Sequence, residues 1–202
     1  MQNREKAKMR EQKILFTLDK LGCLKRSQLQ MILGISDVRM MNRILYRMRK
    51  YLNHVYLGEY AYYLNKKGRE AVGSDREFRK NSQIEHHLMR NDVYIFYHYP
   101  KDWRVECPVT WKENGKEYSI ISDARFTYHD MTYFVEVDVQ QKMVKNRSKI
   151  KKYASLFRVM QKQGVGEPIL LWYTVSPERK AKLEEWCKEY DVPHEVLCKY
   201  TG

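Results

Sequence analysis

The segment Asp37–Leu52 constrains the fold more than any other part of the chain, because its charged and apolar residues follow the period of a helix. At about 100° per residue, Arg39, Arg43 and Arg47 fall in one narrow sector together with Lys50. The opposite side is apolar and consists of Met41, Ile44, Leu45, Met48 and Leu52. The segment is therefore predicted to be a helix with one face in a core and a basic face exposed.

The residues before this segment predict a second, shorter helix. Ser27 is a suitable N-cap for a helix that ends near Leu33, and Gly34 is a suitable terminator. Ser36 or Asp37 then caps the arginine-bearing helix. A short helix, a turn with glycine and a longer helix form a helix-turn-helix, in which the last helix reads the major groove of DNA.

The residues after the segment predict a hairpin. Two β-rich runs, Val55–Leu57 and Ala61–Leu64, surround Gly58–Tyr60. Asn65 is expected to cap a short helix over Lys66–Val72. Because a hairpin that directly follows a reading helix is the wing of a winged helix, the first module is predicted to be a winged helix-turn-helix.

This arrangement assigns roles to particular side chains. Arg39, Asn42 and Arg43 are expected nearest the bases, because Arg pairs with guanine edges and Asn with adenine edges. Arg47 and Lys50 are expected to hold phosphates. Three further residues complete the predicted DNA-binding set. Ser36 precedes the arginine-bearing helix, Tyr60 lies in the hairpin, and Lys66 begins the short helix after it. The alternative is a surface helix with a solvated basic face.

The distribution of charge agrees with a polyanion-binding first module. The formal net charge of the chain is +13. Residues 1–80 contain 19 Lys and Arg against 8 Asp and Glu, whereas residues 81–202 contain 19 against 17. Nearly all of the excess positive charge therefore lies in the first two-fifths of the chain, which favours a nucleic-acid-binding module joined to a nearly neutral one.

Several classes of protein do not fit the composition. The four cysteines are scattered without a CxxC pair, so reduced thiols are expected and a zinc site is not. No apolar run approaches the ~20 residues that span a bilayer, and no secretory leader is recognised. We expect a cytoplasmic, nucleoid-associated protein with no membrane partner.

The second module is predicted to be a mixed α/β domain over residues 82–202, after a winged-helix domain over 1–73 and a polar linker over 74–81. Its order is α-β-β-β-α-β followed by α-β, which makes the whole chain α+β or mixed. The expected helices cover residues 82–98, 146–161 and 177–190. The expected strands cover residues 103–109, 117–128, 132–139, 168–175 and 194–198.

Three carboxylates of the second module are placed where they can meet. Glu136 and Asp138 are two residues apart on one strand, so both face the same side, and Asp123 lies on the preceding strand. Three carboxylates on one sheet face could hold Mg²⁺, as a phosphodiester-cleaving site requires. Glu85 on the preceding helix is a possible fourth ligand.

The order of elements and these acidic positions resemble the restriction-endonuclease-like nuclease core, whose motif is P-D-(D/E)-x-K. The resemblance implies that Asp123 and Glu136 bind metal, but Asp138 stands where the family has Lys. The cation would have to come from Lys142 or Lys149, outside the strand. We therefore expect an inactive core, in which the acidic face pairs with lysines of the next helix; those are Lys149, Lys151 and Lys152.

A second resemblance covers nearly the whole chain. The segment YYLNKKGREAV, an HH-x-x-x-N-D segment, and then SDARF, FVEVDV and KKYASLF are similar to the replication-relaxation family of plasmids, phages and other mobile elements. The residues of the second segment are His86, His87, Asn91 and Asp92. The resemblance implies a role in replication or DNA processing through duplex binding, with ExD as a normal form of the acidic motif.

The expected function is thus double-stranded DNA binding in mobile-element replication, DNA processing or transcription control. One alternative is a metal-dependent nuclease that uses Asp123, Glu136 and Lys142, and another is a regulator that responds to a small ligand or peptide. No cofactor is expected, apart from Mg²⁺ if the nuclease alternative holds. A homodimer or other replication and regulatory proteins are the expected protein partners, because a two-fold dimer suits a palindromic site.

Overall fold

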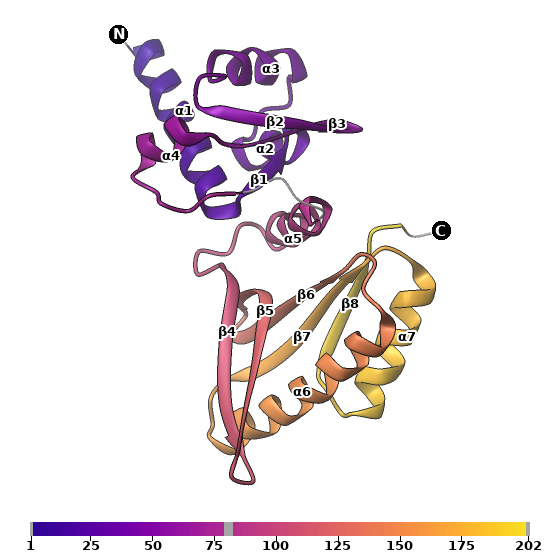
Figure 1. Ribbon diagram of the computed structural model, residues 1–202. Helices are drawn as coiled ribbons and strands as arrows, with labels where there is room; N and C mark the ends of the chain where they lie inside the picture. Colours follow the sequence, from indigo (N-terminus) through magenta and orange to yellow (C-terminus); the bar gives the residue numbers. More distant parts are fainter. Residues whose placement is uncertain (1, 79–82, 201–202) are drawn as a thin grey trace. The chain divides into compact units, whose positions relative to one another are not determined.

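The computed structural model describes residues 2–78 and 83–200 and combines helices with two separate sheets (Figure 1). Contacts divide the chain into two compact units, Met1–Ile95 and Phe96–Gly202. The prediction of a mixed α+β chain with a helical N-terminus is therefore confirmed.

The first unit contains a small antiparallel sheet surrounded by helices (Figure 1). Its strand order is β1-β3-β2. In chain order its elements are α1 (Gln2–Leu21), β1 (Cys23–Lys25), α2 (Arg26–Leu33), α3 (Val38–Arg47), β2 (Leu52–Leu57), β3 (Glu59–Leu64), α4 (Lys66–Val72) and α5 (Ile84–Phe96, which continues one residue into the second unit). The hairpin is tighter than the sequence predicts, because Leu57 and Glu59 are paired and only Gly58 makes the turn.

Two helix boundaries next to the arginine-bearing segment differ from the sequence prediction. Helix α3 ends at Arg47, and the chain turns so that Leu52 begins β2, which leaves Lys50 in the turn and not on the helix. Helix α2 begins one residue before Ser27, so Ser27 is not its N-cap. Instead, the backbone N–H of Lys25 donates to Gln28 Oε1 at 2.9 Å.

Helix α5 belongs to the first unit and not to the second domain, in which the sequence pattern places it. Gln28 Nε2 donates to the carbonyl of Leu88 at 2.8 Å, which fastens α5 to α2. Asn91, fully buried, donates to the carbonyls of Leu21 at 3.1 Å and Cys23 at 2.7 Å. The boundary between units thus follows α5, and part of the predicted linker, residues 79–81, lies outside the described residues.

The second unit is a five-stranded sheet with two helices, α6 and α7, on one face (Figure 1). The order is β4-β5-β6-β7-β8; the pairs up to β6 are antiparallel and the later ones parallel. Its elements are β4 (Arg104–Glu113), β5 (Lys116–Tyr128), β6 (Met131–Asp138), α6 (Met143–Lys162), β7 (Glu167–Thr174), α7 (Pro177–Glu189) and β8 (His194–Cys198). Phe134, Ile150 and Leu170 lie at the centre of the core between sheet and helices.

The four cysteines are free, and three of them, Cys23, Cys107 and Cys187, are buried. Burial raises the pKa of the Cys23 and Cys187 thiols to about 12. None of the helices in the described part of the chain is long and apolar enough to cross a membrane.

Candidate nucleic-acid interface

Helix α3 presents the predicted basic face to solvent. Asp37 caps it, since its carboxylate accepts from the backbone N–H of Arg39 at 2.8 Å and also suits the positive end of the helix dipole. Met41, Ile44 and Leu45 are buried on the inner side. The outer side is exposed and includes Arg39, Asn42, Arg43 and Arg47.

The three arginines of α3 are available for an external partner. Among the described residues, Arg39, Arg43 and Arg47 form no ion pair. Lys50, in the turn after the helix, is also exposed and lies over the ring of Tyr51 at 4.6 Å. The remaining members of the predicted set in the first unit, Ser36, Tyr60 and Lys66, are all exposed.

The β2–β3 hairpin has one face toward the core and one toward solvent. Val55, Ala61 and Tyr63 pack inward. His54 and Tyr60 are on the outer face, with ring centroids 5.2 Å apart, and the same face carries Tyr56 and Tyr62. Tyr60 is 48% exposed. Of these aromatic residues, Tyr60 alone belongs to the predicted DNA-binding set, although the alternation of aromatic residues along both strands also indicates the others.

A groove of about 370 Å³ runs between the exposed side of α3 and this aromatic face. Its lining comes from both elements and from the turn between them: Asn42, Leu45, Tyr46, Arg49, Leu52, His54, Tyr60 and Tyr62. The guanidinium of Arg49 lies over the ring of Tyr46 at 4.3 Å. Tyr46 and Arg49 were not predicted, although both lie beside the basic sector. The surface therefore joins basic and aromatic groups.

Glu59 fastens the tip of the hairpin to helix α2. Its carboxylate accepts from the backbone N–H of Ser27 at 3.0 Å and from the Ser27 hydroxyl at 2.6 Å. Arg26 adds a weaker ion pair at 3.4 Å. The carboxylate thus satisfies a free N–H in the first turn of α2, which is the usual requirement of a helix start.

A second set of contacts holds the chain just after α3. The side chain of Asn65 donates to the carbonyl of Lys50 at 3.0 Å and accepts from the N–H of Gly68 at 2.9 Å. The Asn65 cap of α4 is thereby confirmed. The Asn65 backbone N–H donates to the carbonyl of Tyr51 at 3.0 Å. A Cβ on Gly68 would lie 2.3 Å from that same carbonyl oxygen, so only glycine fits there.

In the second unit, Glu136 is fully buried and both of its carboxylate oxygens are engaged. Lys149 Nζ donates to one oxygen at 2.5 Å, and the hydroxyl of Tyr153 donates to the other at 2.7 Å. Asp123 accepts from the backbone N–H of Val137 at 2.7 Å. Burial and, secondly, the negative charge of Asp123 raise the pKa of Glu136 to about 7. Of the three lysines on the next helix that were expected to pair with the acidic face, Lys149 forms an ion pair with Glu136.

Asp138 has a different partner from Glu136. Arg179 on α7 binds both of its oxygens, with Nε and Nη2 each at 2.6 Å, and the Thr174 hydroxyl donates to it at 3.0 Å. A bidentate, buried Arg–carboxylate pair of this kind is strong. Asp138 is thus engaged by α7, whereas Glu136 is engaged by α6.

The predicted magnesium ligands are not gathered into one group in the described part of the chain. Among residues 2–78 and 83–200, no three His, Cys, Asp or Glu side chains are grouped closely enough to hold a metal ion. Glu85 lies on α5 in the first unit and is exposed. Lys142 is exposed at the start of α6, so it is Lys149 that reaches Glu136.

Comparisons with known proteins identify one family. A model of the family described as Replication-relaxation matches residues 15–168. Among solved structures, the chain is similar to protein VC1899 from Vibrio cholerae, at 12% sequence identity and a TM-score of 0.39. That match covers 90% of this chain and 46% of the other, so the chain spans about half the length of that protein. No curated protein matches the chain significantly.

Proposed function

Because the chain belongs to the replication-relaxation family, we propose that it binds double-stranded DNA in the replication or processing of a mobile element. The proposed reading surface is the exposed side of α3 together with the outer face of the β2–β3 hairpin. The family supports the setting, and the first unit supplies the surface.

The arrangement of the first unit supports a winged helix-turn-helix. Helix α2 ends at Gly34, which adopts a left-handed conformation with φ +66°, and α3 follows after a three-residue connection. The β2–β3 hairpin then stands in the place of a wing. In this class of fold the second helix of the pair enters the major groove and the wing touches the backbone or minor groove.

One observation carries the proposal: the exposed row of Arg39, Arg43 and Arg47, which form no ion pair among the described residues. Like charges in a row repel one another, and a polyanion relieves that repulsion. Arg39 and Arg43 near the start of α3 suit base edges, whereas Arg47, near its end, and Lys50 suit phosphates.

The test begins with selection of bound duplexes from a random pool, using the full chain. Paired half-sites about 10 base pairs apart would indicate a dimer on the DNA. On the selected duplex, Arg43→Ala is expected to weaken binding by about 1–3 kcal/mol in a fluorescence-anisotropy titration, because it removes a base contact. The matched control is Lys188→Ala, an exposed cation on α7.

Two results would contradict the proposal. One is unchanged affinity of the Arg43 variant, and the other is an equal loss in the Lys188 variant, which would indicate a charge effect of the whole protein. Arg47→Ala separates the roles further, because loss of a phosphate contact weakens all duplexes alike and reduces the salt dependence by about one counterion.

For the second unit we propose a restriction-endonuclease-like core that does not cut DNA. The order β4-β5-β6-β7, with the last pair parallel, supports the fold. The engagement of Asp138 by Arg179 supports the lack of cutting. The contact of Lys149 with Glu136 is instead the one that the nuclease alternative would use. Supercoiled DNA should remain intact with Mg²⁺ or Mn²⁺. Nicking that Asp123→Ala abolishes would establish the nuclease alternative instead.

A further inference from the structure

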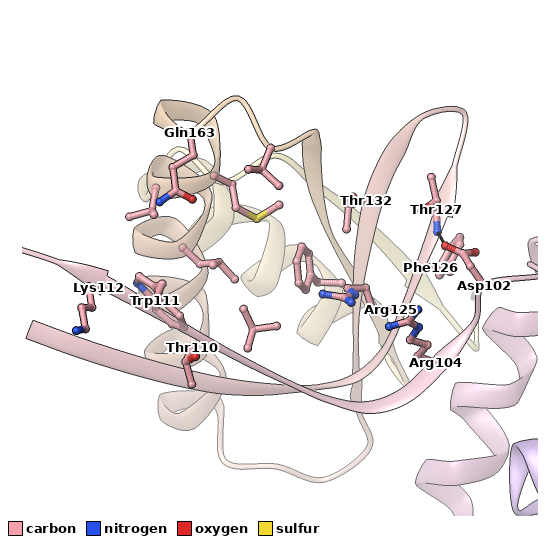
Figure 2. A pocket seen from close by; sticks show the side chains of 16 residues that line it. Asp102, Arg104, Thr110, Trp111, Lys112, Arg125, Phe126, Thr127, Thr132 and Gln163 are labelled. Atoms are coloured by element: carbon pink, nitrogen blue, oxygen red, sulfur yellow. Dashed lines mark hydrogen bonds between the residues drawn. The ribbon is translucent and has the colours of Figure 1, made fainter.

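The second unit contains a pocket of about 410 Å³ between the β4–β5 hairpin and the end of α6 (Figure 2). One side is apolar, with lining residues Val109, Phe134, Leu156, Val159 and Met160. A volume in the range of roughly 300–1,000 Å³ is typical of small-molecule sites. The pocket is separate from Glu136 and Asp138, which do not line it.

Two arginines lie together in this pocket. Arg104 and Arg125 are directly opposite each other in the β4–β5 register, and Figure 2 shows both side chains in the pocket close to one another. Arg125 is also opposite Phe134 on β6, so the charged groups adjoin the apolar side. Like charges directly opposite on adjacent strands destabilise a sheet. A bound anion would relieve the repulsion of such a pair.

The described residues supply no such anion by direct contact. Neither Arg104 nor Arg125 forms an ion pair among them. Asp102 is the acidic residue of the pocket lining, and its carboxylate accepts from the backbone N–H of Thr127 at 2.9 Å. Burial raises the pKa of the nearby Cys107 thiol, and the charges of Arg125 and Arg104 lower it in part. Lys112 adds a further cation to the lining.

We propose that this pocket binds a small organic anion, with a carboxylate or phosphate group between Arg104 and Arg125 and an apolar body against Phe134 and Met160. Guanidinium groups bind both kinds of anion through paired N–H donors. The apolar side excludes a fully hydrated ion such as free phosphate as the best ligand. This site lies in the second unit and goes beyond the proposed DNA binding.

The test uses the full chain and four probes: octanoate, octyl phosphate, 1-octanol and inorganic phosphate. Binding is followed by titration calorimetry and by tryptophan fluorescence, because Trp111 lines the pocket. We expect one or both amphiphilic anions to bind with a Kd of about 1 mM or lower. Octanol and inorganic phosphate should each bind at least about tenfold more weakly, and the tighter of the two octyl anions identifies the headgroup.

Variants separate the site from non-specific binding. Arg104→Gln changes an exposed side chain, and Arg125→Gln a half-buried one. Each should weaken binding of the anion by about 10- to 100-fold, whereas Lys188→Gln, an exposed control, should leave it unchanged. Circular dichroism checks that each variant is folded, and the exposed Arg104 position keeps the test valid if Arg125→Gln does not fold.

Three outcomes would overturn the proposal. These are octanol binding as tightly as the anions, no binding of either octyl anion at about 1 mM, and unchanged binding in both arginine variants. A fourth outcome would also overturn it: if Arg104→Gln weakens duplex binding but leaves binding of the octyl anions unchanged, the two arginines bind nucleic acid instead.

Discussion

Replacement of Glu136 by Gln tests the account of the buried acidic cluster. The amide keeps the shape of the side chain and an oxygen that accepts from the Tyr153 hydroxyl, but it cannot ionise. In the wild-type protein, burial is the main reason that the pKa of Glu136 rises from 4.5 to about 7. Ionisation of this carboxyl is therefore less favourable in the folded state than in the unfolded chain.

The sign of the pH effect follows from proton uptake. Between pH 4.5 and about 7 the folded state binds more protons at this site than the unfolded state. The contribution of Glu136 to stability is thus fully present below its unfolded pKa and is lost as the pH rises through about 7. At roughly 1.4 kcal/mol per pH unit, the wild type should lose about 3 kcal/mol relative to Glu136→Gln over this interval.

The assay is urea unfolding of both proteins between about pH 4 and about pH 8, followed by tryptophan fluorescence. All four tryptophans, Trp103, Trp111, Trp172 and Trp186, lie in the second unit, so the signal reports that unit alone. Glu185→Gln, an exposed carboxylate on α7, is the control. A difference between wild type and Glu136→Gln that stays constant with pH would refute the reasoning.

Two further predictions concern the first unit. Gly68→Ala should destabilise it by about 1–3 kcal/mol in thermal unfolding, because the new Cβ would collide with the carbonyl of Tyr51. This loss should exceed the gain from the better helix propensity of alanine. Glu70→Ala, an exposed position on the same helix, is the control and should change stability little. A fragment of residues 1–95 should give dispersed amide signals in NMR, whereas a fragment of 1–73, which lacks α5, should lose dispersion; equal spectra would contradict the assignment of α5 to this unit.

Local signals in the sequence were sufficient for most elements. The helix starts at Asn65 and Pro177 and the helix end at Gly34 were predicted because a cap or a terminator acts within a few residues of itself. Alternation and apolar runs likewise predicted the strands of the second unit, including the whole of β8.

Features that depend on distant partners were not predicted. Strand β1 has three residues, too few for a period, and exists because Cys23–Lys25 pair with β3. The end of α3 at Arg47 is set by the start of β2 and not by a local terminator, since apolar residues continue to Leu52.

The candidate sites show the same limit. The basic face of α3 could be predicted because one helix contains it. The engagement of Asp138 could not, because its partner Arg179 lies 41 residues further along the chain. The opposition of Arg104 and Arg125 likewise depends on the register of two strands. Contacts of this kind depend on the tertiary fold and have no local signal in the sequence.

The hydrogen bond from the Asn65 side chain to the carbonyl of Lys50, just after α3, has a consequence for the entropy of binding. With Asp37 at one end of α3 and Asn65 on the carbonyl of Lys50 just after the other, the backbone of this helix is held at both ends in the absence of a partner. Within this helix, the ordering that association adds would then be that of the long side chains, about 0.5–1.5 kcal/mol each, besides the loss of translational and rotational freedom. A change at Asn65 would weaken the proposed DNA binding without removing a single contact with the duplex.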